Sequence, residues 1–206
     1  MSFADQTLDQ FLDNLASSAP TPGGGTASAV AGAMGVSLLM MVAGLPKSRT
    51  NSDDERRQLD QSRATLGELR AALTAAADDD AAAFDAVMAA YRQPKATDDE
   101  KTARKAAITA AMRGATEAPR TTLDLCARAL AIGIDVAQCG NPSASSDIRV
   151  AAQLLMAGAE GAAANVRINL DGMSDTAYRD EVATATERAL TDVHASGAAV
   201  ARALAG

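Results

Sequence analysis

Aromatic residues are scarce in this chain of 206 residues, which has no tryptophan, three phenylalanines and two tyrosines. Alanine, by contrast, occupies about 50 positions. Because alanine is the strongest helix former and strands favour aromatic and β-branched residues, this balance argues against a β-sandwich or β-barrel. We expect an all-α fold, organised as one helical domain over residues 1–206 that is large enough to fold without disulfides.

Positive charge is also in short supply. The chain has 19 Lys and Arg residues against 26 Asp and Glu residues, a formal net charge of -7. A net negative surface repels phosphate backbones, and the scarcity of aromatic rings removes the usual platforms for stacking bases. We therefore expect no nucleic-acid partner.

Thiols and imidazoles are few. The chain has two cysteines, Cys126 and Cys139, and one histidine, His194. These cannot build a disulfide framework or a four-thiolate zinc site, and they supply neither a catalytic metal site nor a Ser-His-Asp triad. We expect reduced cysteines, no metal and no tightly bound cofactor. The acidic N-terminal segment MSFADQTLDQ does not match a secretory signal, so we expect a cytoplasmic location.

One long uncharged run is present, over residues 21–45. Its apolar part, Ala29–Leu45, has 17 residues and lies at the short limit for a membrane span of ~20 residues. Its small side chains favour a helix that protein buries on all sides over a helix in lipid. We expect no membrane association.

Apolar spacing and capping residues predict the helices. Leu8, Phe11, Leu12 and Leu15 share one face of a first, three-turn helix. The segment 21–26, with its proline and three glycines, is expected to be irregular, and Thr26 or Ser28 to cap the uncharged helix that follows as far as about Gly44.

Longer helices follow. One is predicted from Ser52 to about Pro94, and a capping box at Thr97–Glu100 opens the next, which Pro119 ends or kinks before a run to about Gln138. A loop over residues 139–144 then leads to a helix capped by Ser145 or Ser146 that reaches about Leu170, and Ser174 opens the last helix. A helix of some 40 residues is about 60 Å long, which exceeds the width of a compact chain of this size. We therefore expect a homodimer built on the long helices.

One acid interrupts an apolar seam in the helix after Ser52. Every seventh position from Leu59 reads Leu66, Leu73, Asp80 and Val87, so Asp80 stands where the pattern calls for an apolar residue. Burial beside Phe84 would raise the pKa of Asp80 and suit it to transfer protons near neutral pH. Alternatively, Asp80 pairs with a basic residue of a neighbouring helix and fixes its register.

Two further segments carry candidate binding groups. Gly23, Gly24 and Gly25 lead into a helix start and could present free backbone N–H groups to an anion, or could simply allow a tight connection between helices. Lys47 and Arg49 follow the uncharged helix and could steer an anionic substrate tail, or could be a solvated loop pair.

Polar residues near the fifth predicted helix complete the candidates. Asn141 lies in the loop before it, and Ser146 and Asp147 lie at its start, where capping accounts for the last two. Asn165 and Asn169 share a face one turn apart and need hydrogen-bond partners, which could be structural or could belong to a polar pocket.

Taken in order, several segments resemble one family, that of formiminotetrahydrofolate cyclodeaminase and methenyltetrahydrofolate cyclohydrolase. The segments that carry the resemblance cover nearly the whole chain: 17–25 (SSAPTPGGG), 79–88 (DDAAAFDAVM), 94–101, 140–147 (GNPSASSD) and 165–169 (NVRIN). The proline-triple-glycine segment and the segment from Gly140-Asn141 to Ser146-Asp147 together are specific for this family, although neither would be alone. Relatives often carry a basic Gly-Lys-Lys-Tyr-like segment where this chain has Lys47 and Arg49.

The resemblance implies an all-helical domain that dimerises through long helices and binds a reduced folate near the interface. It assigns the catalytic acid to Asp80, the residue that the seam pattern also singles out. The expected activity is hydrolysis of 5,10-methenyltetrahydrofolate to 10-formyltetrahydrofolate. Cyclodeamination of 5-formiminotetrahydrofolate, with release of ammonia, is the nearest alternative, and a helical dimer that binds a folate-like ligand without turnover is another.

Overall fold

The structure, a computed structural model, describes residues 2–45 and 51–205. Within these ranges it contains six α-helices, two short 3-10 helices and no strand, which confirms the all-α prediction. The α-helices are α1 (Leu8–Ala16), α2 (Gly24–Ala43), α3 (Asp53–Tyr91), α4 (Asp98–Cys139), α5 (Ser145–Asp171) and α6 (Thr176–Ala203), and the 3-10 helices are η1 (Phe3–Asp5) and η2 (Pro142–Ala144).

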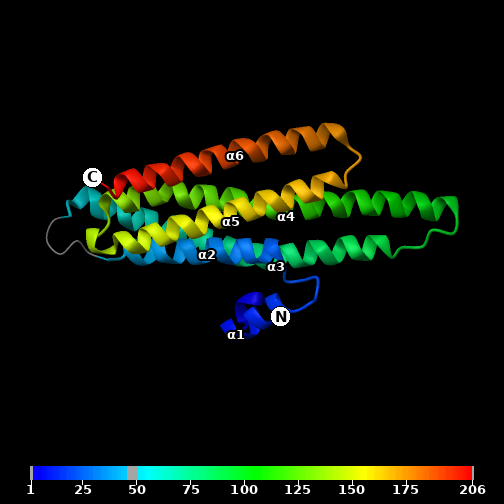
Figure 1. Cartoon of the computed structure of the whole chain (residues 1–206), viewed down its shortest axis with the longest axis horizontal. Coiled ribbons are helices and arrows are strands. Elements are labelled where there is room, and N and C mark those ends of the chain that lie inside the picture. The colour runs from blue at the N-terminus through cyan, green and yellow to red at the C-terminus, as the bar shows by residue number, and fades with distance from the viewer. Residues whose placement is uncertain (1, 46–50, 206) are drawn as a thin grey trace.

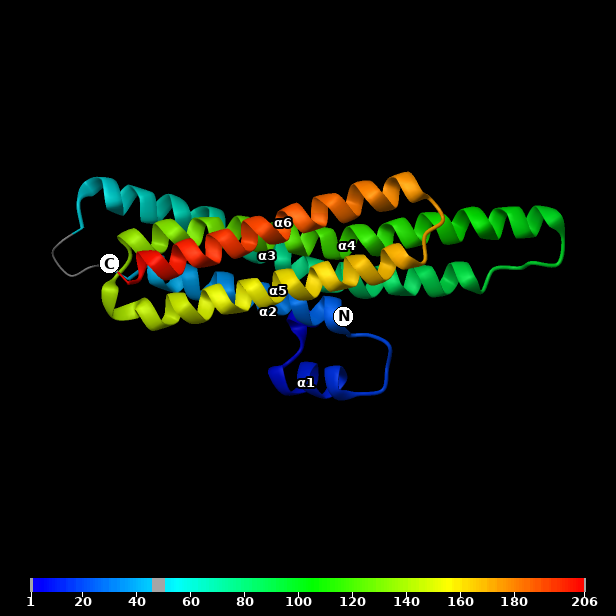
Figure 2. The same ribbon diagram turned by 45° about the horizontal axis from the view of Figure 1, so that its top comes forward.

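The five longer helices form an elongated bundle, and α1 stands off its side (Figure 1). α2 packs on α3 and α5, α4 packs on α3, α5 and α6, and the α3–α4 hairpin projects beyond the turn between α5 and α6 (Figure 2). The hairpin therefore leaves the first turns of α4 uncovered by α6.

The two longest helices begin where capping residues predict. Ser52 and Glu55 form a capping box at α3, and Thr97 and Glu100 form one at α4. The two helices have 39 and 42 residues, which confirms the predicted long helices. α3 and α4 pack against each other within the same chain. The predicted dimer was argued from helices too long for one compact chain to cover, and this packing covers part of that length.

Pro119 does not end α4, contrary to one of the two predicted outcomes, and the helix runs through it. A proline has no N–H to donate, so the carbonyl oxygen of Ala115, four residues earlier, loses its helical partner. Asn169 on α5 replaces that partner, because its Nδ2 donates to the Ala115 oxygen over 2.6 Å. Packing between helices thus compensates for the missing backbone hydrogen bond.

Three helix starts differ from their predictions. α2 begins at Gly24, so residues 24–26 are helical rather than irregular, and neither Thr26 nor Ser28 is its cap. α5 follows Ala144, which provides no side-chain cap. The cap of α6 is Asp175, one residue after the predicted Ser174, and its carboxylate accepts from the Tyr178 amide.

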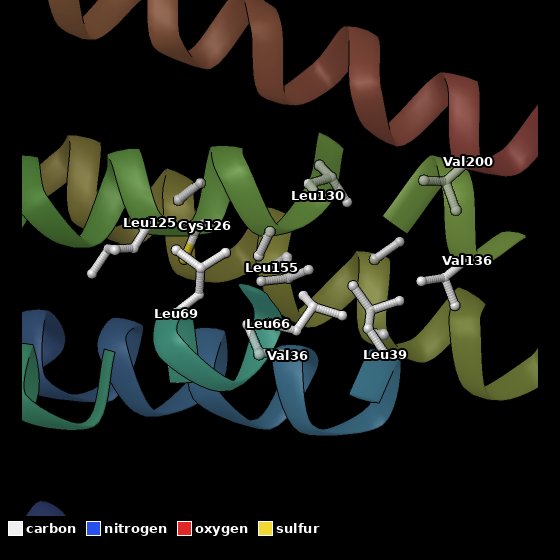
Figure 3. Close-up of a cluster of buried hydrophobic side chains, with 14 of the residues drawn as sticks. Val36, Leu39, Leu66, Leu69, Leu125, Cys126, Leu130, Val136, Leu155 and Val200 are labelled. Carbon is white, nitrogen blue, oxygen red and sulfur yellow. The ribbon is translucent and has the colours of Figure 1, made fainter. Parts of the chain in front are cut away.

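The core lies where α2, α3, α4 and α5 meet (Figure 3). Leu39, Leu66, Leu130, Val136 and Leu155 are almost completely shielded from solvent there. Leu66 belongs to the seam predicted for α3, and Leu59 and Leu73 of that seam are also buried. The apolar stripe therefore faces the core as the heptad spacing predicts.

One side of α2 remains open, contrary to the prediction of burial on all sides. Met34 and Met41 are 54% and 44% exposed, beside a groove of about 690 Å³ between α1 and the bundle. Among the described residues α2 is the one helix whose length and hydropathy would allow it to cross a membrane, and half of it is buried in the bundle.

Candidate active site

A cavity of about 250 Å³ lies where the start of α2 meets α3, α4 and the last turns of α5. It brings together six of the predicted site residues: Gly23, Gly24, Gly25, Asp80, Asn165 and Asn169. The rest of its lining is Pro20, Thr21, Ala83, Phe84, Val87, Met112 and Ala115. Of these lining residues, all within the described ranges, Asp80 alone is ionisable.

Asp80 points from α3 at the first turn of α2. Its Oδ2 accepts a hydrogen bond from the Thr26 hydroxyl over 3.0 Å, and the Thr26 backbone N–H also bonds to the carboxylate. Gly23, the residue at the N-cap of α2, has no side chain to do this. Asp80 therefore caps α2 from a neighbouring helix, where the helix dipole favours a negative charge.

Gly25 provides the space for this carboxylate. A Cβ atom built on Gly25 would overlap both oxygens of Asp80, whereas a Cβ on Gly24 or Gly23 would meet its nearest neighbour at 3.5 or 3.6 Å, an ordinary contact. The three glycines are thus not equivalent. Gly25 must lack a side chain for Asp80 to lie where it does.

The pKa of Asp80 lies above its ordinary value. Partial burial is the main cause, because it disfavours the charged form, and the hydrogen bonds from the Thr26 side chain and backbone offset part of this rise. A carboxylate whose pKa is raised is a stronger base than an exposed carboxylate, so it accepts a proton more readily.

Asn165 and Asn169 of α5 also line the cavity, and Asn165 lies beside Gly24. The Nδ2 of Asn165 donates to the Gly161 carbonyl within α5, and that of Asn169 donates to Ala115 on α4. Both amide nitrogens are therefore fixed by the protein. Among the described residues neither Oδ1 accepts a hydrogen bond, so two carbonyl oxygens of fixed orientation can accept N–H donors of a ligand.

Apolar side chains make up most of the rest of the wall. Phe84 and Val87 of α3 and Met112 of α4 are half-buried at the cavity. A cavity with apolar walls, one carboxylate and a few oriented amides suits a flat, polar-edged heterocycle. Its volume fits part of a drug-sized ligand, with the remainder outside.

The second predicted loop lies elsewhere. Asn141, Ser146 and Asp147 do not line this cavity: Asn141 accepts from the Ser143 amide, and the start of α5 lies about 28 Å along the helix from Asn165. Lys47 and Arg49 lie outside the described residues. Asn51, two residues after Arg49, donates from its Nδ2 to the Cys139 carbonyl, so residue 51 is hydrogen-bonded to the start of the loop over residues 139–144.

Several residues at the site were not predicted to belong to it, namely Thr26, which bonds to Asp80, and the lining residues Pro20, Thr21, Ala83, Phe84, Val87, Met112 and Ala115. Thr26 was interpreted as a helix cap, and Met112, Ala115 and Val87 carry no polar signal that would mark them as lining residues. The one available clue was Pro119, whose missing N–H predicts that the carbonyl of Ala115 needs an outside donor.

Known proteins share this arrangement of sequence and fold. Residues 7–188 match the family described as formiminotransferase-cyclodeaminase. A methenyltetrahydrofolate cyclohydrolase from Methylorubrum extorquens is 42% identical over 177 residues, which cover 86% of this chain and 85% of that protein.

Two further proteins match more distantly in sequence. A formimidoyltransferase-cyclodeaminase from Rattus norvegicus is 33% identical over 187 residues, 87% of this chain and 33% of that longer protein. The crystal structure of formiminotetrahydrofolate cyclodeaminase from Thermotoga maritima has 27% identity and a TM-score of 0.87, covering 98% of each chain. The chain belongs to the formiminotransferase-cyclodeaminase family.

Proposed function

We propose that this protein is a methenyltetrahydrofolate cyclohydrolase that converts 5,10-methenyltetrahydrofolate to 10-formyltetrahydrofolate with Asp80 as general base and then general acid. The observation that carries the proposal is the half-buried Asp80 carboxylate, the one ionisable group on the wall of the described cavity. The 42% identity to a protein of that name supports the choice of reaction.

The first step is attack by water on the methenyl carbon, which is the centre of an amidinium cation. Asp80 removes one proton from the water as the C–O bond forms, and the product is a neutral carbinolamine. The negative charge of Asp80 also favours the approach of the cationic ring. The α2 N-terminus and Thr26 hold the carboxylate in place for this step.

The second step opens the ring. Protonated Asp80 gives its proton to N5 as the bond between N5 and the carbon breaks, while the carbinol hydroxyl loses its proton to solvent and becomes the formyl carbonyl. The balance is one water consumed and one proton released, and Asp80 returns to its ionised form. The raised pKa of Asp80 makes it a stronger base for the first step, and it keeps the carboxyl protonated until N5 takes the proton in the second.

The other polar groups orient the substrate in this proposal. The Oδ1 atoms of Asn165 and Asn169 accept N–H donors on the pterin edge, and the face of Phe84 packs on its ring. Substrate contacts were also predicted for five other residues, and these stay predictions. Asn141, Ser146 and Asp147 do not line the cavity, and Lys47 and Arg49 lie outside the described residues.

Cyclodeamination of 5-formiminotetrahydrofolate is the second candidate. The likeness to the Thermotoga maritima protein, over nearly the whole of both chains, favours it. The same carboxylate would serve, because in that reaction N10 attacks the formimino carbon and loses its proton, and the formimino nitrogen is protonated and departs as ammonia.

A product assay on the purified chain separates the two. With 5,10-methenyltetrahydrofolate, a cyclohydrolase speeds the loss of methenyl absorbance and releases no ammonia. With 5-formiminotetrahydrofolate, a cyclodeaminase releases ammonia as methenyl absorbance appears. Ammonia release at a higher kcat/KM than methenyl hydrolysis would overturn the first assignment, and turnover of neither substrate would overturn both.

A homodimer remains part of the proposal. Leu8 of α1, Met34 and Met41 of α2, and Val150 of α5 are exposed apolar side chains that line the groove beside α1. Exposed apolar groups gathered in this way are typical of a protein interface. We place the second subunit against this side of α2.

A further inference from the structure

The backbones of α2 and α5 approach each other closely where the two helices lie side by side (Figure 1). A Cβ atom on Gly158 would lie 2.7 Å from the carbonyl oxygen of Ser28, and one on Gly35 would lie 2.8 Å from that of Ala151. Both contacts are with backbone atoms, which cannot rotate away as a flexible side chain does. The separation of the two helices is therefore fixed along this contact.

One polar side chain, that of Ser28, is enclosed between the two helices. It is 7% exposed, and its Oγ donates to the carbonyl oxygen of Gly24 over 2.7 Å. A Cβ atom on Gly161 of α5 would overlap this Oγ. The missing side chain of Gly161 thus leaves a notch in α5, and the hydroxyl of Ser28 occupies it.

The carbonyl group that Ser28 binds belongs to the first turn of α2, on the wall of the candidate active site. This turn contains Gly24 and Gly25, and glycine has more backbone freedom to lose in a helix than any other residue. From α3, the carboxylate of Asp80 restrains the turn by accepting from Thr26. On the side of α5, the bond from Ser28 restrains it.

The notch also lies next to a polar group of the cavity on α5. The Nδ2 of Asn165 donates to the Gly161 carbonyl over 2.8 Å, and it lies 3.5 Å from the position of a Cβ atom on Gly24. Asn165 and Gly24 both line the cavity. A change at the notch would therefore move the first turn of α2 relative to Asn165.

We infer that Ser28 is a positioning residue for the reaction, because its buried hydroxyl fixes the first turn of α2 in the place where Thr26 meets the Asp80 carboxylate. The inference rests on the proposed function, in which that carboxylate is the base. Ser28 does not line the cavity and acts through the backbone of Gly24.

The test compares Ser28→Ala, Gly161→Ala and the double variant with the wild type. Ser28→Ala removes the bond to Gly24, and Gly161→Ala displaces the same hydroxyl. In the double variant the two Cβ atoms meet at 3.5 Å, an ordinary contact, so the helices keep their separation. Ser37→Ala is the matched control, because Ser37 forms the same kind of bond with Ala33 further along α2 and does not line the cavity.

Two readouts report on Asp80, the one ionisable group that lines the cavity within the described ranges. The first is an NMR titration of its carboxyl carbon, assigned with Asp80→Asn, which needs no turnover. The second is the acid limb of the kcat/KM profile. The bonds from Thr26 lower the pKa of Asp80, so weakening them should move both the titration and the limb to higher pH in each single variant.

Turnover should change together with the titration. We expect kcat for 5,10-methenyltetrahydrofolate to fall about three- to tenfold in each single variant and no further in the double variant. The two substitutions act through one hydroxyl, so their effects on kcat and on the Asp80 titration should not add. Ser37→Ala should keep the wild-type titration and kcat.

Three results would overturn the inference and leave the proposed function intact. They are an unmoved Asp80 titration in Ser28→Ala, additive effects in the double variant, and an equal change in Ser37→Ala. A lower Tm with an unmoved titration would mean that Ser28 only stabilises the fold. If the wild type turned over neither folate, the proposed function would fail. The NMR titration would still decide the inference, because a midpoint at higher pH in Ser28→Ala would support it and an unchanged midpoint would refute it.

Discussion

The Nδ2 of Asn169 donates to the carbonyl oxygen of Ala115 over 2.6 Å, at the point where Pro119 deprives that oxygen of its partner within α4. This bond joins two helices on the wall of the candidate active site. It also fixes which way the Asn169 amide faces, so that its oxygen is left for a ligand. A defect in one helix is therefore used to orient a polar group on another.

A double-mutant cycle tests this relationship. Asn169→Leu leaves the Ala115 carbonyl without a donor and should lower the free energy of unfolding by about 1–3 kcal/mol. In a Pro119→Ala background the residue-119 amide can bond to Ala115 again, so the same change should cost clearly less. Urea unfolding of the four proteins gives the coupling energy, and additive effects would show that the bond does not compensate for Pro119.

Gly25 and Gly24 form a matched pair for the next prediction. Gly25→Ala forces the Asp80 carboxylate to move, since the new methyl group overlaps both oxygens, and kcat should fall at least about tenfold. Gly24→Ala places its methyl group at an ordinary distance from Asn165 and should keep activity near wild type. Similar losses of kcat in both variants would contradict the special role of Gly25.

The hydrogen bonds from Thr26 offset part of the rise in the pKa of Asp80 that burial causes. Thr26→Val removes a hydrogen bond that lowers this pKa, so the pKa should rise further. The acid limb of the kcat/KM profile, where Asp80 loses its proton to become the base, should move to higher pH. Thr26→Ser keeps the hydroxyl donor and should keep the wild-type profile; an unmoved limb in Thr26→Val would count against the assignment.

Stability should also depend on pH through Asp80. Its pKa is raised in the folded state, so the folded protein holds the proton more tightly than the unfolded chain. The ionised group therefore costs stability, and that cost appears as pH rises from the unfolded pKa through the folded pKa. The Tm of Asp80→Asn minus the Tm of wild type should therefore increase across this interval and level off above it. A difference that stays constant with pH would mean that burial of the ionised carboxylate does not lower stability.

The proposed subunit interface has its own test. Met34→Glu places a charge on the open side of α2, beside the groove, and should shift a dimer toward monomer. Ile168→Glu is the control, because Ile168 is 69% exposed on α5 and lies away from the groove lining. Light scattering after size exclusion should give twice 20.9 kDa for the wild type and the control. A wild-type monomer would refute the dimer.

The fold was largely predictable from local signals. The capping boxes at Ser52 and Thr97 and the heptad spacing of Leu59, Leu66 and Leu73 each act over a few residues, and each was confirmed. The start of α2 was not, because its cap comes from Asp80, 54 residues away along the chain from Thr26. A capping rule that considers only neighbouring residues cannot find such a partner.

The site residues that could be predicted are polar residues at positions where the sequence pattern calls for buried, apolar ones. Asp80 in an apolar seam, and Asn165 and Asn169 inside a helix, are costly unless the fold uses them, and all three line the same cavity. Met112 and Ala115 give no such signal. The distance between Asn141 and the cavity follows from helix length and packing, which the sequence of one loop does not contain.

Turnover of 5,10-methenyltetrahydrofolate by purified Asp80→Asn is the most direct test of the role of Asp80. The variant keeps the size of the side chain and an oxygen that can accept from Thr26, so we expect a folded protein with a wild-type circular dichroism spectrum. Loss of the general base should reduce kcat by about 10²–10⁴-fold. A folded Asp80→Asn protein that consumes the substrate at the wild-type rate would contradict the account.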